Sequence, residues 1–263
     1  MISTPRSPAK HGLGLIPDRY DPRDYILEAV PHFFVGAIPP SVDMRNLCSP
    51  VRDQGQLGSC TGFALGAGMR EFLEIKSGKP SPMVVLSPLF IYYQERKLEH
   101  HVNEDSGATI RDGMKVLAKI GVCPEADDPY DITKFTKQPS RRAVTDAKQF
   151  LIAAYHRVTT LMGLKQTLAQ GNAAALGIVV YESFEAPKTA SSGHVPMPKP
   201  GEHVLGGHAV FCAGYQDDTQ YEGGGYLIVK NSWGTGFGDK GYVYLPYAYV
   251  QPKLMTDIWT ASL

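Results

Sequence analysis

Cysteine is scarce in this chain: the 263 residues contain four, namely Cys48, Cys60, Cys123 and Cys212. Small domains that depend on disulfides carry a much higher proportion, so this scarcity excludes a disulfide scaffold. No two of the cysteines follow the Cys-x-x-Cys spacing, which argues against a structural zinc site. We therefore expect a protein that uses no metal and no other cofactor.

An excess of charge and a long apolar run are also absent. Lysine plus arginine number 26 and aspartate plus glutamate number 26, which argues against a nucleic-acid or membrane partner. No apolar run approaches the ~20 residues of a membrane span. The first twenty residues lack the apolar core of a secretory signal, so we expect a cytoplasmic protein or one exported by another route. We also expect a monomer.

Proline, by contrast, is concentrated at the start, where residues 1–40 hold seven of the 20 prolines. This spacing breaks any long helix, and only Asp24 to Val30 is suited to a short strand or helical turn. We interpret residues 1–38 as an arm outside the main core. Residues 39–263 then form one domain, a length that a single core can support.

Helical patterns precede strand patterns along the domain. Helices are predicted at 61–76, 87–100, 109–121 and 161–171, and strands at 175–181, 208–215, 225–231 and 241–246. The segment 185–206 contains four prolines and is predicted to be a long loop. This order indicates an α+β fold, with a helical lobe, a β lobe and a cleft between them.

The stretch QGQLGSCTGFALGAG, Gln54 to Gly68, crowds small residues around Cys60. Such a helix is intrinsically weak but lets neighbours approach closely, so we expect it to be central and buried. With Ser59 as the N-cap, Cys60 lies in the first turn, where unpaired N–H groups and the helix dipole favour a thiolate. Taken alone, however, a cysteine among small residues is more simply explained by packing.

A nucleophile also needs a base and a group that orients the base. His208 opens an apolar strand, and Asn231 ends another strand and can fix the tautomer of an imidazole. Each also has a plain structural explanation, as a satisfied histidine and as a turn residue. Gln54 offers a side-chain N–H that can form an oxyanion hole with the Cys60 N–H. The remaining histidines are expected to be solvated: His11, His32, His100, His101, His156, His194 and His203.

Three blocks together resemble the papain-like cysteine peptidases, in that family's order. They are DQGQLGSCTGFA, GGHAVFCAGY and YLIVKNSWGTGFGDKGYVYL, and PPSVDMRN resembles the start of the mature domain. The resemblance covers roughly Pro39 to Tyr244 and implies a two-lobed fold that cleaves protein or peptide substrates. It implies that Cys60 is the nucleophile, His208 the general base and then acid, Asn231 its orienting residue and Gln54 the oxyanion donor.

The same resemblance implies three substrate-binding residues: Gly107, Gly207 and Trp233, of which Trp233 also covers the histidine and borders the leaving-group side. The chain departs from the family at Leu57, where a disulfide cysteine is usual, at Thr61 and Phe237, where tryptophan is usual, and at Gly207 before the histidine. Because of these departures, the sequence does not predict which side chains the substrate pockets accept. A Cys48–Cys123 disulfide is compatible with the pattern, but free thiols are favoured, and Cys212 is expected to be buried and inert.

Two questions stay open at the level of sequence. The first is the activity. An amidase or acyl transferase would need the same cysteine–histidine pair as a peptidase, and a catalytically silent binding module would have the same fold. The arm, including GLGLIPDRYDPRDYILEAV, either lies extended along the cleft and blocks it, as in a zymogen, or packs elsewhere. A tethered segment has an effective concentration on the order of millimolar, so weak contacts would suffice to block substrate.

Overall fold

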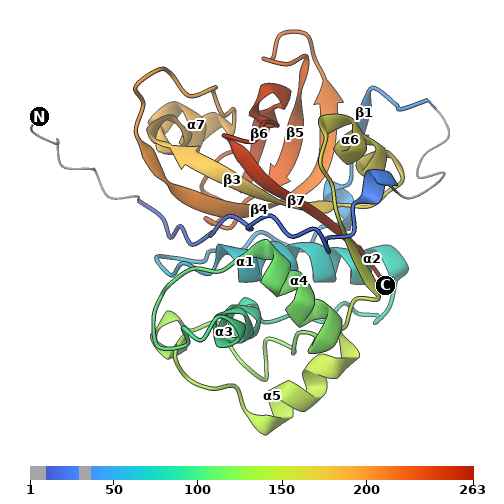
Figure 1. Ribbon diagram of the computed structural model, residues 1–263, viewed down its shortest axis with the longest axis vertical. Helices are drawn as coiled ribbons and strands as arrows, with labels where there is room; N and C mark the ends of the chain where they lie inside the picture. The colour runs from blue at the N-terminus through green and yellow to red at the C-terminus, as the bar shows by residue number, and fades with distance from the viewer. Residues whose placement is uncertain (1–9, 30–36) are drawn as a thin grey trace, which may run out of the picture.

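The protein, seen here as a computed structural model that describes residues 10–29 and 37–263, has a helical layer below a β-sheet layer (Figure 1). The helices are α1 (Cys60–Gly62), α2 (Glu71–Ser77), α3 (Pro88–Leu98), α4 (Ile110–Lys119), α5 (Arg141–Asp146), α6 (Leu161–Ala169) and α7 (Pro187–Ser192). The predicted α+β layout, with a helical lobe and a β lobe, is confirmed. No helix among the described residues is long and apolar enough to cross a membrane.

The sheet is antiparallel and runs in the order β2-β7-β3-β4-β5-β6, with β1 added beside β4. Its strands are β1 (Ser41–Asp43), β2 (Ala154–Arg157), β3 (Ala174–Tyr181), β4 (Val204–Asp217), β5 (Gly225–Lys230), β6 (Tyr242–Pro246) and β7 (Met255–Ser262). The four predicted strands are β3, β4, β5 and β6. The central β4 pairs with β3 over Val204–Cys212 and with β5 and β1 over its second half, so its first half, which contains His208, is held by β3.

The central helix is one continuous helical run of three parts: α1, a π-helical turn over Phe63–Arg70, and α2. Its small residues permit close contacts, as predicted. A Cβ on Gly62 would lie 2.3 Å from the Pro88 carbonyl oxygen, and one on Gly68 would lie 2.8 Å from the Phe211 side chain. Because these glycines have no side chain, the central helix packs directly against both α3 and β4.

The predicted loop over 185–206 is only partly a loop. It contains α7, and β4 already begins at Val204. Pro187, one of the four prolines of this segment, occupies the first turn of α7, where proline has no N–H to leave unpaired and its fixed φ suits a helix. Gly193, in the left-handed conformation, ends that helix.

The arm was predicted to lie outside the main core, and this is wrong for Leu15. That side chain is 6% exposed and belongs to the main apolar cluster, which also contains Ile178 and Ala209. Figure 1 shows this part of the arm running between the sheet and the helical layer. A short helical turn, Leu27–Ala29, fulfils the expectation for Asp24 to Val30, although Val30 itself lies outside the described residues.

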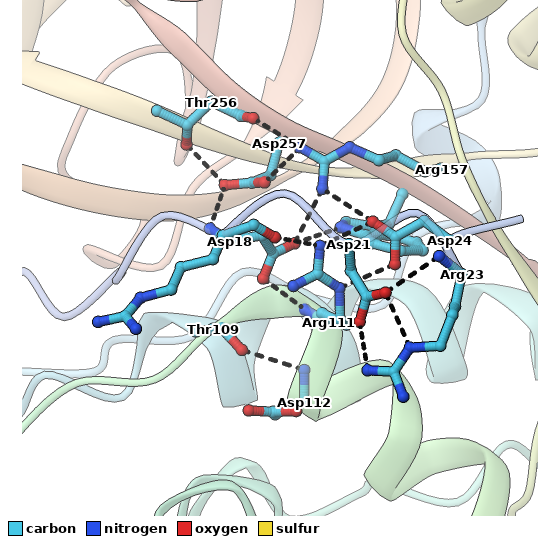
Figure 2. A network of polar contacts seen from close by, with 12 residues as sticks. Asp18, Asp21, Arg23, Asp24, Thr109, Arg111, Asp112, Arg157, Thr256 and Asp257 are labelled. Carbon is cyan, nitrogen blue, oxygen red and sulfur yellow. Dashed lines mark hydrogen bonds and ion pairs between the residues drawn. The ribbon is translucent and has the colours of Figure 1, made fainter. Parts of the chain in front are cut away.

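Further along, the arm is held by a network of charges, which we call the charged anchor: Asp18 and Asp24 of the arm with Arg111, Arg157 and Asp257 (Figure 2). Arg111 donates to both carboxylate oxygens of Asp24, at 2.9 and 2.7 Å. Arg157 reaches Asp257 at 2.9 Å and lies 3.5 Å from both Asp18 and Asp24. The anchor thus joins the arm to α4, β2 and β7.

Candidate active site

Cys60 begins α1 and is fully buried. Burial raises the pKa of its thiol to about 11, against hydrogen bonds from the backbone of Ala209 and Gly14. Ser59 precedes the helix as predicted, but its side chain does not cap it. The Ser59 hydroxyl instead pairs with the Tyr130 hydroxyl at 2.6 Å, so the helix N-terminus gains no side-chain acceptor there.

His208 lies in β4, and Asn231 directly follows β5, the strand paired with β4. The strand pairing brings them together: His208 Nε2 lies 2.8 Å from Asn231 Oδ1. The other ring nitrogen, Nδ1, is buried and has no hydrogen-bond partner among the described residues. Burial is the main reason why the pKa of His208 falls to about 4.

Trp233 covers this histidine. The two rings stack with centroids 4.7 Å apart, and a second imidazole, that of His11, also stacks on Trp233, at 4.3 Å and 8° from parallel. His11 was expected to be solvated, and this is wrong, because it is packed on Trp233 and lies beside Glu185. Nothing in the local sequence of the arm signals this contact, since it depends on where the arm is folded.

Gln54 is held by both ends of its amide. Its Oε1 accepts a hydrogen bond of 2.6 Å from the Ser232 hydroxyl, while its Nε2 donates to the carbonyls of Leu57 at 2.9 Å and Gly12 at 3.1 Å. The Ser232 N–H also donates to Asn231 Oδ1 at 2.8 Å. Ser232 therefore connects Asn231 with Gln54. It was visible in the NSWG block but was assigned no role from the sequence.

The arm passes this site as an extended strand. Leu15 N donates to the Gly207 carbonyl at 3.1 Å, Ile16 N donates to Ala108 O at 2.9 Å, and Ala108 N donates to Gly14 O at 2.8 Å. Gly107 lets the arm approach closely, because a Cβ at this position would lie 2.2 Å from the Gly14 carbonyl oxygen. The backbone groups in these hydrogen bonds thus belong to Gly207 and to Ala108, which is next to the predicted Gly107.

The departures from the family pattern have structural partners of their own. Leu57, which stands where the family usually has a disulfide cysteine, is buried in an apolar cluster with Leu89 and Tyr92. The Thr61 hydroxyl donates to the fully buried carboxyl of Glu95 at 2.6 Å. Burial raises the pKa of Glu95 well above its ordinary value.

All four cysteines are free thiols, as favoured from the sequence, and Cys123 packs with Phe90 in a cluster separate from the main core. Cys212 is fully buried, as expected. Within residues 10–29 and 37–263, no group of three or more histidine, cysteine, aspartate or glutamate side chains is arranged to hold a metal ion. The groups that the structure gathers at this site are a thiol, an imidazole and side-chain amides.

In this state both reactive groups are neutral at pH 7. A thiol with a pKa of about 11 keeps its proton, and an imidazole with a pKa of about 4 has lost its own. The physical cause is the same for both, because a charge removed from water without a partner is strongly disfavoured. A thiolate–imidazolium pair requires water or a polar group to reach the site.

Known proteins resemble this chain in sequence and in structure. The family model described as "Papain family cysteine protease" matches residues 38–256. The "Uncharacterized peptidase C1-like protein L477" of Acanthamoeba polyphaga mimivirus is 41% identical over 79% of this chain and 68% of its own length. "Cysteine proteinase 3" of Entamoeba histolytica is 27% identical over 80% of this chain, which spans only 64% of that protein.

Among solved structures, xylellain, a cysteine protease from Xylella fastidiosa, has a TM-score of 0.83 and 38% identity, and the match covers 99% of each chain. Procathepsin L 3 of the Tenebrio molitor larval midgut matches with a TM-score of 0.69 at 20% identity, covering 97% of this chain and 76% of that one, and supports the fold alone. The family match and the viral relative decide the assignment: this chain belongs to the papain family of cysteine proteases, which are cysteine-type peptidases.

Proposed function

We propose that the chain hydrolyses peptide bonds with Cys60 as nucleophile, His208 as general base and then acid, Asn231 as the orienting residue and Gln54 as oxyanion donor. The observation that carries this proposal is the hydrogen bond from Gln54 Nε2 to the Gly12 carbonyl. This carbonyl, two residues before the Gly14 backbone that hydrogen-bonds to the Cys60 thiol, already uses the donor that a developing oxyanion would need. The 2.8 Å contact of His208 with Asn231 leaves Nδ1 as the nitrogen available to exchange a proton.

The steps follow from these positions. His208 takes the thiol proton, and the Cys60 sulfur attacks the carbonyl carbon, whose oxygen is held by Gln54 Nε2 and the Cys60 N–H. His208 then protonates the leaving amine as the C–N bond breaks, which leaves a thioester on Cys60. Water, deprotonated by His208, cleaves the thioester and releases the acid. Gly207 and Trp233 border the substrate on either side of the reacting carbonyl, with Gly107 giving its backbone room.

We also propose that residues 1–38 are an autoinhibitory arm on a peptidase domain formed by residues 39–263. Two observations support this. Residues 12–16 already bond to Gln54, Gly207 and Ala108, the groups that a substrate backbone would need. In addition, the site that they cover holds Cys60 and His208 in their neutral forms, so the arm would suppress both access and reactivity.

Replacing the nucleophile tests the chemistry. The Cys60→Ala chain should remain folded, since it removes one buried sulfur atom, and it should release no new peptide amine from an internally quenched peptide. Release of an amine from a peptide, as opposed to ammonia from a side-chain amide, separates a peptidase from an amidase. Peptide cleavage that survives in Cys60→Ala would refute the assignment of the nucleophile.

Removing the arm tests the inhibition. A chain that begins at Pro39 should cleave a fluorogenic peptide faster than the full-length chain, provided that circular dichroism shows both to be folded. Cys60→Ala in each length supplies the background. Equal rates for two folded chains would count against an inhibitory arm and would leave the peptidase assignment intact.

A further inference from the structure

Asp105 is an acidic residue near the oxyanion donor that the mechanism above does not use. It lies in the segment between α3 and α4, two residues before Gly107. Both oxygens of its side chain accept from the Gly58 N–H, each at 3.1 Å. Gly58 is buried two residues before Cys60, and a Cβ there would lie 2.9 Å from Asp105 Oδ1, so a side chain at this position would push the carboxyl group away.

The Gly58 N–H belongs to the peptide group whose other end is the Leu57 carbonyl. That carbonyl accepts the hydrogen bond of 2.9 Å from Gln54 Nε2, so Asp105 and Gln54 hold opposite ends of one peptide group. Because a peptide group is planar, fixing the direction of its N–H also fixes the direction of its carbonyl. An acceptor on the N–H also polarises the carbonyl, which strengthens the hydrogen bond that the carbonyl receives.

The Leu57 carbonyl in turn decides where the second N–H of the Gln54 amide points. Nε2 carries two N–H groups, of which one donates to Leu57 O and the other to Gly12 O, the arm carbonyl that uses the donor needed by the oxyanion. At the other end of the amide, the Ser232 hydroxyl holds Oε1. A shift of the Leu57 carbonyl would therefore turn the second N–H away from the oxyanion.

A buried tyrosine fixes the orientation of Asp105. The Tyr92 hydroxyl donates to Asp105 Oδ1 and accepts from the Gly107 N–H at 3.0 Å. Tyr92 is fully buried and packs in the same apolar cluster as Leu57. The carboxyl group of Asp105 is thus held toward Gly58, although Asp105 itself is an exposed residue.

We propose that Asp105 is a positioning residue for peptide hydrolysis, which orients the peptide group between Leu57 and Gly58 and, through it, the Gln54 amide that stabilises the oxyanion. Asp105 itself touches neither the substrate nor the reacting atoms. This inference rests on the proposed peptidase function and adds a residue to its oxyanion site. The contact also ties down the chain next to Leu57, the position where the family usually has a disulfide cysteine.

A simpler alternative makes Asp105 a tie that stabilises the fold and nothing more. Loss of such a tie, or a change in how often the arm covers the site, alters every reaction of Cys60 by the same factor. Loss of a positioning residue for the oxyanion alters only the reactions in which an oxyanion forms. Two different reactions of the same sulfur atom therefore separate the alternatives.

The experiment measures both reactions with the full-length chain. Cleavage of a fluorogenic peptide, measured as kcat and KM, passes through an oxyanion. In alkylation by iodoacetamide, the Cys60 sulfur forms a bond to carbon as iodide leaves, the thiol proton goes to the solvent, and no oxyanion forms. Because the chain has three further free cysteines, mass spectrometry follows the alkylation of Cys60 alone. The quantity compared is kcat/KM divided by the alkylation rate constant.

In Asp105→Ala this ratio should fall about tenfold, through kcat and not KM, because the oxyanion donor is displaced but not removed. Asp105→Asn keeps an oxygen near the Gly58 N–H and should stay within about threefold of the unsubstituted chain. Tyr92→Phe, which keeps the ring but releases the carboxyl group, should lower the ratio several-fold. The matched control is Glu104→Ala, whose side chain is 70% exposed and lies beside His101, and its ratio should not change.

An unchanged ratio in an Asp105→Ala chain that is folded by circular dichroism would overturn the role of Asp105 and leave the peptidase function intact. The same conclusion follows if cleavage and alkylation fall by one common factor. If iodoacetamide alkylates Cys60 in the unsubstituted chain but no peptide is cleaved, the peptidase function is overturned, and this inference with it.

Discussion

Two stretches of the arm are held to the domain in different ways. Residues 12–15 lie against it through backbone hydrogen bonds and bare glycine Cα atoms, and a Cβ on Gly14 would lie 1.8 Å from the Gly58 carbonyl oxygen. The charged anchor, a few residues later, holds Asp18 and Asp24 through arginine side chains. The first contact depends on shape and the second on charge.

The difference separates two functions within one segment. In the proposed autoinhibition, backbone pairing beside Cys60 would exclude water and substrate, and the structure leaves no room for a side chain at Gly14. The charged anchor joins the arm to α4, β2 and β7, and we expect it to affect how firmly the arm stays bound. Substitutions in the first stretch should therefore release the site, whereas substitutions in the second should adjust the fraction of chains in which it is covered.

The largest effect is expected from Gly14→Val in the full-length chain. A valine there cannot be accommodated without moving the Gly58 backbone, and overpacking of this kind costs about 1–3 kcal/mol or more. At 1.4 kcal/mol per factor of ten, peptide cleavage should rise by up to about a hundredfold. The initial rate on a fluorogenic peptide measures this rise.

Gly236→Val is the matched control, because an added Cβ at that glycine meets no atom within 4 Å. Its cleavage rate should equal that of the unsubstituted chain. If Gly14→Val is folded and cleaves no faster than this control, then close contact of residues 12–15 does not limit activity.

The rate at which iodoacetamide alkylates Cys60 should differ between the full-length chain and Gly14→Val. Only the thiolate reacts, so with a pKa of about 11 the alkylation rate of the full-length chain should rise about tenfold per pH unit from pH 6 to 10, without a plateau. In Gly14→Val, water reaches the site, the thiol pKa falls, and the rate should level off at a lower pH. The same pH profile for both chains would contradict the idea that burial under the arm keeps the thiol protonated.

Asp24→Asn weakens the second stretch. It removes the charge from a nearly buried pair with Arg111 while keeping the shape of the side chain, at an expected cost of about 1 kcal/mol to arm binding. Cleavage should increase by about fivefold. Asp21→Asn is the control, since Asp21 pairs with Arg23 of the same segment, and equal effects of both variants would show that net charge alone matters.

The smallest effect is expected from salt. Raising NaCl from 0.05 to 0.5 M screens the mostly buried ion pairs of the charged anchor only weakly, so cleavage by the full-length chain should increase by no more than about twofold. Asp24→Asn should respond less, because its main ion pair is already lost. Gly14→Val should not respond, since its arm is already displaced, and an equal salt response in all three chains would locate the effect outside the anchor.

Much of the fold was readable in the sequence because its elements carry local signals. The helix of Cys60, the strand of His208 and the turn after Asn231 each have their own periodicity and boundary residues. The prediction of a loop over 185–206 was wrong in part because Pro187 begins a helix instead of preventing one. The prediction that His11 is solvated was wrong for another reason. The groups around His11 are Trp233 and Glu185, which are more than 170 residues away in the sequence.

The sequence by itself determined the residue types of the site, their order and the small side chains that let the central helix approach β4. Only the tertiary structure decided that Leu15 is part of the core, that the Gly12 carbonyl meets Gln54, and that Cys60 and His208 are neutral as they stand. The physical reason is that chemical identity belongs to a residue, whereas its pKa and its partners depend on which distant groups exclude water from it.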